Sequence, residues 1–179
     1  MALAAATGCA GIRLPRTWPP ATLAGVTTPN DVYTHGHHES VVRSHAWRTP
    51  QNSAGYLLPH LRPGLDLLDI GCGPGTITLG FEALVAPGRV IGVDRSADIV
   101  AQAVTARPTG STVEFRVGDA YALDLAAASV DVVHAHQVLQ HLSDPVAALA
   151  EWRRVCRPGG VVAARDADYA AFTWYPHDP

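Results

Sequence analysis

From residue 65 onward, the hydrophobic positions of the chain follow two patterns that alternate. Short apolar runs have the length and composition of buried strands, and between them lie segments of about ten residues with apolar positions at helical spacing. The alternation predicts an α/β fold: a parallel sheet of five strands with helices on both faces. The expected strands are 65–70, 90–93, 112–117, 130–135 and 161–164, and the expected helices are 76–85, 96–106 and a segment that begins at Pro145.

The last of these helices has a clear start and a clear end. Asp144 precedes Pro145, and an acid at the cap followed by a proline in the first turn is typical of a helix start. The sequence Arg-Pro-Gly-Gly at 157–160 is expected to end the helix and to turn the chain into the fifth strand. The apolar positions expected to face the sheet are Val146, Leu149, Trp152 and Val155.

The chain before residue 64 has a different character. Residues 1–30 contain several prolines and no charged side chains except Arg13 and Arg16, so we expect a disordered or misassigned leader. No positive charge precedes the apolar start, which disfavours a secretion signal and a lipobox at 6–9. Residues 31–63 are expected to form an N-terminal helical lid, with helical periodicity over 39–61 and a break at Pro50. Residues 64–179 are the expected α/β domain.

The composition excludes several classes of function. With a net charge of −3, the chain has no excess of basic side chains that would neutralise nucleic-acid phosphates. No apolar run approaches the roughly 20 residues of a membrane-spanning helix. Cys9, Cys72 and Cys156 are far apart, which disfavours disulfides and a zinc site. We therefore expect a cytoplasmic protein with a small-molecule partner and with no nucleic-acid or membrane partner.

The candidate chemistry lies where the first expected strand ends. Asp69 is followed by a loop in which Gly71, Gly73 and Gly75 allow a sharp turn and the close approach of a ligand. Asp94 ends the next expected strand about 20 residues later, where a carboxylate can accept hydrogen bonds from both hydroxyls of a ribose. The motif predicts a nucleotide-like ligand.

The spacing of the glycines and the charge of Asp69 indicate which kind of nucleotide the loop binds. A dinucleotide loop has the spacing G-x-G-x-x-G, whereas this chain has Thr76 at the third glycine position and the tighter spacing G-x-G-x-G. A negative charge at Asp69 would repel a diphosphate and would favour a ligand that carries a sulfonium and an ammonium. NAD is therefore disfavoured.

At these residues the chain resembles the class I S-adenosylmethionine-dependent methyltransferases, in particular the small-molecule group that includes the ubiquinone and menaquinone biosynthesis C-methyltransferases. The resemblance covers residues 33–166. It implies a Rossmann-like fold, S-adenosylmethionine as the cofactor, and methyl transfer to a small-molecule O, N or C acceptor. Beyond the glycine loop, it rests on stretches at 118–120, 132–136 and 157–160.

The resemblance also implies which residues hold S-adenosylmethionine. Among them, Cys72 is expected to be a small loop residue and not a nucleophile, because nothing near it in the sequence marks a lowered pKa. The implied residues are Asp69, Gly71 and Gly73 at the methionine portion, Asp94 at the ribose, Gly118, Asp119 and Ala120 in the stretch whose acid reaches the adenine amino group, and His136 at the strand end that faces the sulfonium. Cys72, Gly75, Arg95 and Gln137 are expected to bind the cofactor as well, with no part of it assigned to them.

A group of histidines precedes the expected sheet. A metal site there is disfavoured because no matching set of cysteines or carboxylates is evident, and no metal is expected. The resemblance instead places this region over the cofactor as a lid, with Tyr33 or Arg48 as contacts to the methionine carboxylate. The histidines are His35, His37, His38 and His45.

His141 is the candidate catalytic residue, with two interpretations that stay open. It follows the end of the fourth expected strand, where it is either a general base or a helix-start residue that bonds the backbone. Methyl transfer is an in-line displacement at an activated carbon, so positioning of the acceptor can supply much of the rate. A catalytic residue outside any motif is therefore compatible with the resemblance.

The resemblance further implies strands that are not found in this sequence. The family has seven strands, and the chain ends at Pro179, soon after the fifth expected strand. We expect the usual last two strands to be missing and the fifth strand to be an exposed edge that favours homo-oligomers. Two functions stay open: a methyltransferase, or a truncated module that binds the cofactor without catalysis. The sequence does not determine the acceptor.

Overall fold

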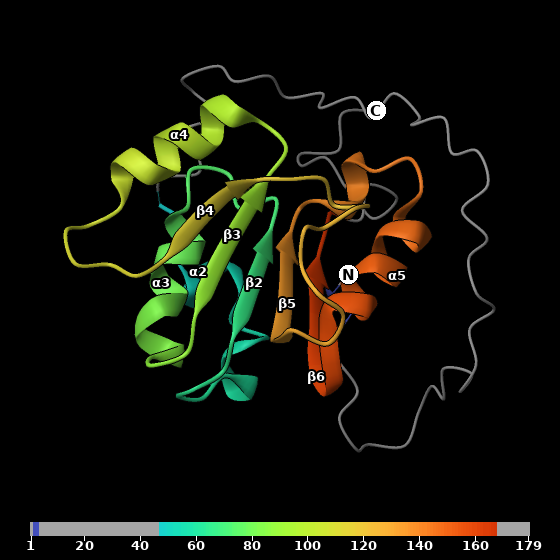
Figure 1. The fold of residues 1–179 in the computed structure, drawn as a ribbon, viewed down its shortest axis with the longest axis horizontal. Helices are drawn as coiled ribbons and strands as arrows, with labels where there is room; N and C mark the ends of the chain where they lie inside the picture. The colour runs from blue at the N-terminus through green and yellow to red at the C-terminus, as the bar shows by residue number, and fades with distance from the viewer. Residues whose placement is uncertain (1, 4–46, 168–179) are drawn as a thin grey trace, which may run out of the picture.

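The computed structural model describes residues 2–3 and 47–167, which form one six-stranded sheet flanked by helices (Figure 1). The strand order is β1-β6-β5-β2-β3-β4, and β2 to β6 are parallel, whereas β1 is antiparallel to β6. The strands are β1 (Ala2–Leu3), β2 (Leu67–Ile70), β3 (Val90–Asp94), β4 (Glu114–Val117), β5 (Val130–His136) and β6 (Cys156–Arg165). The helices are α2 (Pro50–Ser53), α3 (Thr76–Val85), α4 (Ala97–Ala106) and α5 (Pro145–Val155), with short 3-10 helices η1 (Leu58–His60) and η2 (Leu139–His141). The predicted Rossmann-like fold, with five parallel strands and helices on both faces, is confirmed.

Each face of the sheet has its own hydrophobic core. On one face, Phe81 of α3 packs with strand residues that include Leu67 and Val132. On the other face, the fully buried Trp152 of α5 packs with residues that include Leu68. Because side chains alternate along a strand, neighbours such as Leu67 and Leu68 enter opposite cores. Both faces are covered, which explains why the strands are continuous apolar runs in the sequence.

The long helices begin where the sequence predicts. α3 spans the expected residues. Ser96 caps α4, and its hydroxyl accepts a hydrogen bond from the backbone N–H of Ile99 at 3.4 Å. Asp144 caps α5 in the same way, because Oδ1 accepts from the backbone N–H of Ala147 at 2.9 Å. Among the described residues, no helix has the length and hydrophobicity needed to cross a membrane.

Two details of α5 and β6 differ from the prediction. Val146 is 55% exposed and does not face the sheet, whereas Ala148 is buried. The strand begins at Cys156, directly after the helix, so the segment 157–160 lies within β6 and not before it. Cys156 pairs with Val130, and a shift of register follows along this pair of strands. The sequence hides this pairing because the glycines of the segment are typical of a turn.

The outer edge of β6 differs from the expected open edge. Ala2 pairs with Arg165, and Leu3 pairs with Ala164, in antiparallel register. The prediction that the last parallel strand is an exposed edge is therefore wrong over this part of the strand, because β1 supplies hydrogen-bond partners there. The remainder of the expected leader lies outside the described residues.

The expected N-terminal lid lies largely outside the described residues as well. Within its described part, the structure has two short helices, α2 and η1, after the position of the expected break at Pro50. Thr49 and Asn52 form a capping box at the start of α2, and Pro50 occupies the first turn. Pro50 therefore begins a helix at the position where the sequence predicts a break.

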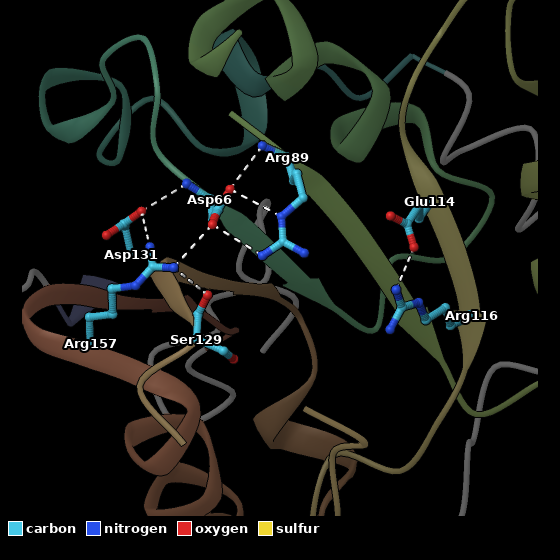
Figure 2. Close-up of polar contacts among 7 residues, drawn as sticks. All are labelled: Asp66, Arg89, Glu114, Arg116, Ser129, Asp131 and Arg157. Carbon is cyan, nitrogen blue, oxygen red and sulfur yellow. Dashed lines mark hydrogen bonds and ion pairs between the residues drawn. The ribbon is translucent and has the colours of Figure 1, made fainter. Parts of the chain in front are cut away.

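A network of ion pairs joins the strands at the amino-terminal end of the parallel sheet, opposite the glycine loop (Figure 2). Asp66, just before β2, bonds Arg89 and Arg157 at 3.1 Å each. Arg157 also bonds Asp131 at 2.6 Å and the carbonyl of Ser129 at 2.8 Å. Hydrogen bonding from Arg89 is the largest cause that lowers the pKa of Asp66 to about 2. The network links β2, β3, β5 and β6.

We expect Asp66→Asn to lower the free energy of unfolding at pH 7 by about 1–2 kcal/mol, because two partly exposed arginines lose their carboxylate. The lowered pKa stabilises the fold fully above the ordinary value of 3.8 and ceases to do so as the pH falls through about 2. Urea unfolding should therefore show a difference from the wild type that shrinks below about pH 4.

The control for this variant is Glu114→Gln, which removes the exposed ion pair with Arg116 that is also drawn in Figure 2. An exposed pair contributes less than about 1 kcal/mol. Equal losses for the two variants, or a loss at Asp66 that is independent of pH, would contradict the role of the network.

Candidate functional site

The loop between β2 and α3 needs its glycines for two different reasons. Gly71, Gly73 and Gly75 all have positive φ, at 65°, 55° and 83°. A Cβ on Gly71 would lie 2.4 Å from a methyl carbon of Val138, and a Cβ on Gly75 would lie 2.6 Å from the ring of Phe115. A Cβ on Gly73 would meet no described atom within 4 Å. Two of the glycines therefore allow close packing within the protein, and Gly73 leaves open space beside the loop.

Asp94 brings a carboxylate to this loop from the end of β3. Because β2 and β3 are parallel neighbours, their carboxyl ends lie side by side. Oδ2 of Asp94 accepts from the backbone N–H of Gly73 at 3.0 Å, and Oδ1 accepts from that of Ser96 at 3.0 Å. The side chain is half-buried, so a ligand at the loop can reach it. Arg95, the next residue, is exposed.

Asp69 lies behind the loop, in the core. The residue is 3% exposed. Oδ1 lies 2.7 Å from Nδ1 of His134, and Oδ2 accepts from the hydroxyl of Thr78 at 2.5 Å. The sequence places this carboxylate close to the loop, and the structure adds that both of its oxygens already have partners within the protein.

Cys72 has a packing position in the loop. Its side chain is buried, and burial is the main cause that raises the pKa of the thiol, to which the charges of Asp69 and Asp94 add. The protonated thiol is a poor nucleophile. The geometry is therefore that of the small loop residue that the sequence predicts.

The stretch at 118–120 lies beside Asp94. The backbone N–H of Gly118 donates to the carbonyl of Asp94 at 3.0 Å. Asp119 is exposed and uses Oδ1 to accept from the backbone N–H of Tyr121 at 2.9 Å. The carbonyl of Ala120 accepts from the indole N–H of Trp152 at 3.0 Å, which fixes the turn against α5. The implied adenine stretch, residues 118–120, therefore lies next to Asp94, the implied ribose residue.

The end of β5 brings His136 and Gln137 to the same edge of the sheet. Burial and the nearby Arg48 are the largest causes that lower the pKa of His136 to about 4, so the imidazole is neutral at pH 7. Gln137 has φ 58°, which is uncommon for a residue with a side chain and occurs often at functional sites. Its Oε1 accepts from Nη2 of Arg48 at 2.8 Å. Residues 89 positions apart in the chain therefore meet at this strand end.

His141 ends η2, one short turn beyond β5. Its Nε2 lies 3.1 Å from Nε2 of Gln140, and the backbone N–H of Gln140 donates to Asp166 at 3.2 Å. The structure thus places His141 in the segment that follows His136 and Gln137. Because His141 is the last residue of η2 and α5 is capped by Asp144, His141 does not start a helix, and that interpretation is wrong. Its role as a base stays a prediction.

Comparison with known proteins identifies the family. Residues 68–164 match the family model described as a methyltransferase domain. The chain belongs to this family. An uncharacterized methyltransferase of Schizosaccharomyces pombe is 40% identical over 154 residues, which are 82% of this chain and 55% of that protein. A ubiquinone biosynthesis O-methyltransferase of Cereibacter sphaeroides is 38% identical over 100 residues, which are 55% of this chain and 40% of that enzyme.

A solved structure has the same fold. The YcgJ protein of Bacillus subtilis superimposes with a TM-score of 0.60 at 30% identity, over 65% of this chain and 50% of that protein. The resemblance to class I methyltransferases is confirmed, and S-adenosylmethionine is the cofactor of this family. The methyltransferase domain spans about half the length of the Schizosaccharomyces pombe relative.

Metal-ligand geometry is not found in the described part of the methyltransferase domain, where no three histidine, cysteine or acidic side chains gather as a metal site requires. The four N-terminal histidines, His35, His37, His38 and His45, and the implied contact Tyr33 lie outside the described residues. The absence of a metal stays a prediction.

Three side chains near the site are not singled out by the sequence: Tyr56, His134 and Arg165. The signal for His134 was present, because it is two residues before His136 and alternation places both on one face of β5. Parallel register then sets His134 opposite Asp69. Tyr56, read from the sequence as one apolar helix position, stacks on His134 with ring centroids 6.2 Å apart.

We expect Gly73→Ala to weaken the binding of S-adenosylmethionine at least about tenfold, because the new methyl group enters the open space beside the loop. The positive φ adds a loss of stability of about 1–2 kcal/mol. Gly110→Ala is the matched control, since Gly110 has φ 86° and equally open surroundings away from the site. Calorimetric titration of both variants checks the prediction, and similar affinities for the two variants would contradict it.

Proposed function

We propose that this methyltransferase domain binds S-adenosylmethionine at the carboxyl ends of β2 and β3 and transfers its methyl group to a small-molecule acceptor by in-line displacement. One observation carries the proposal: the open side of Gly73 lies next to the accessible carboxylate of Asp94. A loop that admits a ligand and an acid that accepts from a ribose together suit a nucleoside.

The parts of the cofactor are assigned by the residues available at each strand end. The backbone of Gly71 and Gly73 suits the methionine portion, and Asp94 suits the ribose hydroxyls. Asp119 remains exposed beside Asp94 and suits the amino group of the adenine. Arg48, held by Gln137, is the candidate partner of the methionine carboxylate, because a guanidinium binds carboxylates with paired hydrogen bonds.

Bound S-adenosylmethionine supplies a methyl group that its sulfonium already activates, so the protein needs chiefly to position the acceptor. His136, neutral because its pKa is about 4, avoids placing a second positive charge beside the sulfonium. Its Nδ1 is buried and has no hydrogen-bond partner among the described residues. His141 is the candidate general base.

A small molecule is the acceptor class that the relatives support. The relative from Cereibacter sphaeroides is an O-methyltransferase of ubiquinone biosynthesis. The methyltransferase domain has no excess of positive charge that would favour a nucleic acid. The second candidate function is cofactor binding without turnover.

Two measurements test the proposal. Calorimetric titration with S-adenosylmethionine, S-adenosylhomocysteine and NAD should show binding of the first two only, and binding of NAD alone would overturn it. Release of S-adenosylhomocysteine in the presence of a panel of phenols, carboxylic acids and amines then separates a methyltransferase from a module that only binds. Association through the sheet edge stays a prediction, which ultracentrifugation can test.

Asp94→Ala should weaken the binding of S-adenosylmethionine and S-adenosylhomocysteine equally, by more than about tenfold, because both contain the same ribose. Asp98→Ala is the control, since Asp98 is an exposed acid in the first turn of α4 and affects only the helix, by about 0.5 kcal/mol. If calorimetry shows that Asp94→Ala binds both compounds with the wild-type affinity, Asp94 is not part of the cofactor site.

A further inference from the structure

The segment that follows β4, residues 118–125, has little regular structure of its own. It begins with the implied adenine stretch, and the chain crosses from there to α5 before β5 begins (Figure 1). Its backbone pairing is an isolated bridge between Asp119 and Ala122. Backbone groups that are not paired within a strand or a helix need other partners. The position of the 118–125 turn therefore depends largely on side chains from elsewhere in the domain.

Side chains of α5 bind the backbone of the 118–125 turn. The indole N–H of the fully buried Trp152 donates to the carbonyl of Ala120 at 3.0 Å. Oε1 of Glu151 accepts from the backbone N–H of Leu123 at 2.8 Å. Two neighbouring residues of the helix thus hold two different parts of the turn.

Arg154 adds further bonds through the shape of its guanidinium. Its Nε and Nη2 donate to Oε2 and Oε1 of Glu151 at 2.6 Å and 2.7 Å. Its outer nitrogens also donate to backbone carbonyls of the turn, Nη2 to Leu123 at 3.1 Å and Nη1 to Leu125 at 2.9 Å. A guanidinium holds its donors in one rigid plane, whereas a lysine carries a single ammonium on a flexible stem. Glu151 therefore orients Arg154, and Arg154 reaches two carbonyls at once.

Packing against the sheet fixes the 118–125 turn only in part. A cavity of about 20 Å³ lies between the turn and the sheet, and its lining includes Ile91 and Val93 of β3 and Leu123 and Leu125 of the turn. Atoms that face a cavity lose their contacts on that side. The hydrogen bonds from α5 are therefore more important for the position of the turn than they would be in a close-packed core.

The turn carries Asp119, the exposed acid that is proposed to bind adenine. Oδ1 of Asp119 accepts from the backbone N–H of Tyr121 at 2.9 Å, which leaves Oδ2 for a ligand. A hydrogen bond to a ligand weakens steeply when its length or angle departs from the ideal. A displacement of the turn by about 1 Å is therefore enough to lose this bond in a protein that is still folded.

We propose that Glu151, Trp152 and Arg154 are positioning residues, through which α5 holds Asp119 at the amino group of the bound adenine. This inference rests on the proposed function, which assigns Asp119 to that amino group. The three side chains bond the backbone of the 118–125 turn and not the carboxylate itself. They therefore determine how well the domain distinguishes adenine from a base that lacks the amino group.

The test compares S-adenosylhomocysteine with S-inosylhomocysteine, in which a carbonyl oxygen replaces the amino group, by calorimetric titration of the whole chain. The wild type should bind the adenine compound at least about tenfold more tightly, because a carboxylate accepts from an amino group and not from a carbonyl. Asp119→Ala should bring the two affinities within about twofold of each other. Arg154→Met should lower the preference at least about threefold, and it should lower it no further in the Asp119→Ala chain.

Arg153→Met is the matched control. Arg153 is also an exposed arginine in the last turn of α5, and no hydrogen bond joins it to the 118–125 turn among the described residues. Its loss should leave the preference within about twofold of the wild type. Arg154→Lys keeps the charge but cannot reach both carbonyls, so it should lower the preference nearly as far as Arg154→Met. It takes the place of Arg154→Met if that variant does not fold.

The outcomes separate the two claims. A wild-type chain that binds neither compound contradicts the proposed function and the inference with it. A wild type that binds both compounds equally overturns the inference, and so do equal losses of affinity for both compounds in Arg154→Met and Arg154→Lys. Asp66→Asn, which removes ion pairs at the opposite end of the sheet, should lower the melting temperature without changing the preference. A change there as large as in Arg154→Met would also overturn the inference, because the preference would then follow stability alone.

Discussion

The parallel pairing of β2 with β3 on one side and with β5 on the other is the constraint on which the site depends. It sets Asp69 opposite His134 and brings the end of β3 next to the glycine loop. Parallel strands all present their carboxyl ends at one edge, so residues that are far apart in the chain meet there. Asp94, Gly73 and His136 have no special property alone, and their chemistry arises from this alignment.

Sequence patterns predicted the parts of the fold that local physics determines. Helix α3 and the caps Ser96 and Asp144 depend on periodicity and on hydrogen bonds within a few residues. The partners of Asp69 were not predicted, because the contact with His134 spans 65 positions and requires the register of two strands. The pairing of β1 with β6 was missed for the same reason, since it joins the two ends of the described chain.

The two acids at the proposed site have different surroundings. Asp94 is half-buried next to the open side of Gly73, where a ligand can reach its carboxylate. Asp69 is buried, and both of its oxygens have partners within the protein. One of these partners, His134, is a residue that a motif built on glycines and acids does not include.

The ion-pair network around Asp66 and Arg157 lies at the end of the sheet opposite the glycine loop. These ion pairs thus join the strands at the end of the sheet where no ligand is proposed. Substitutions that reshape the loops at the other end can therefore accumulate without unfolding the scaffold. Homologues of this domain can therefore differ in the acceptor that they methylate while they keep the same sheet.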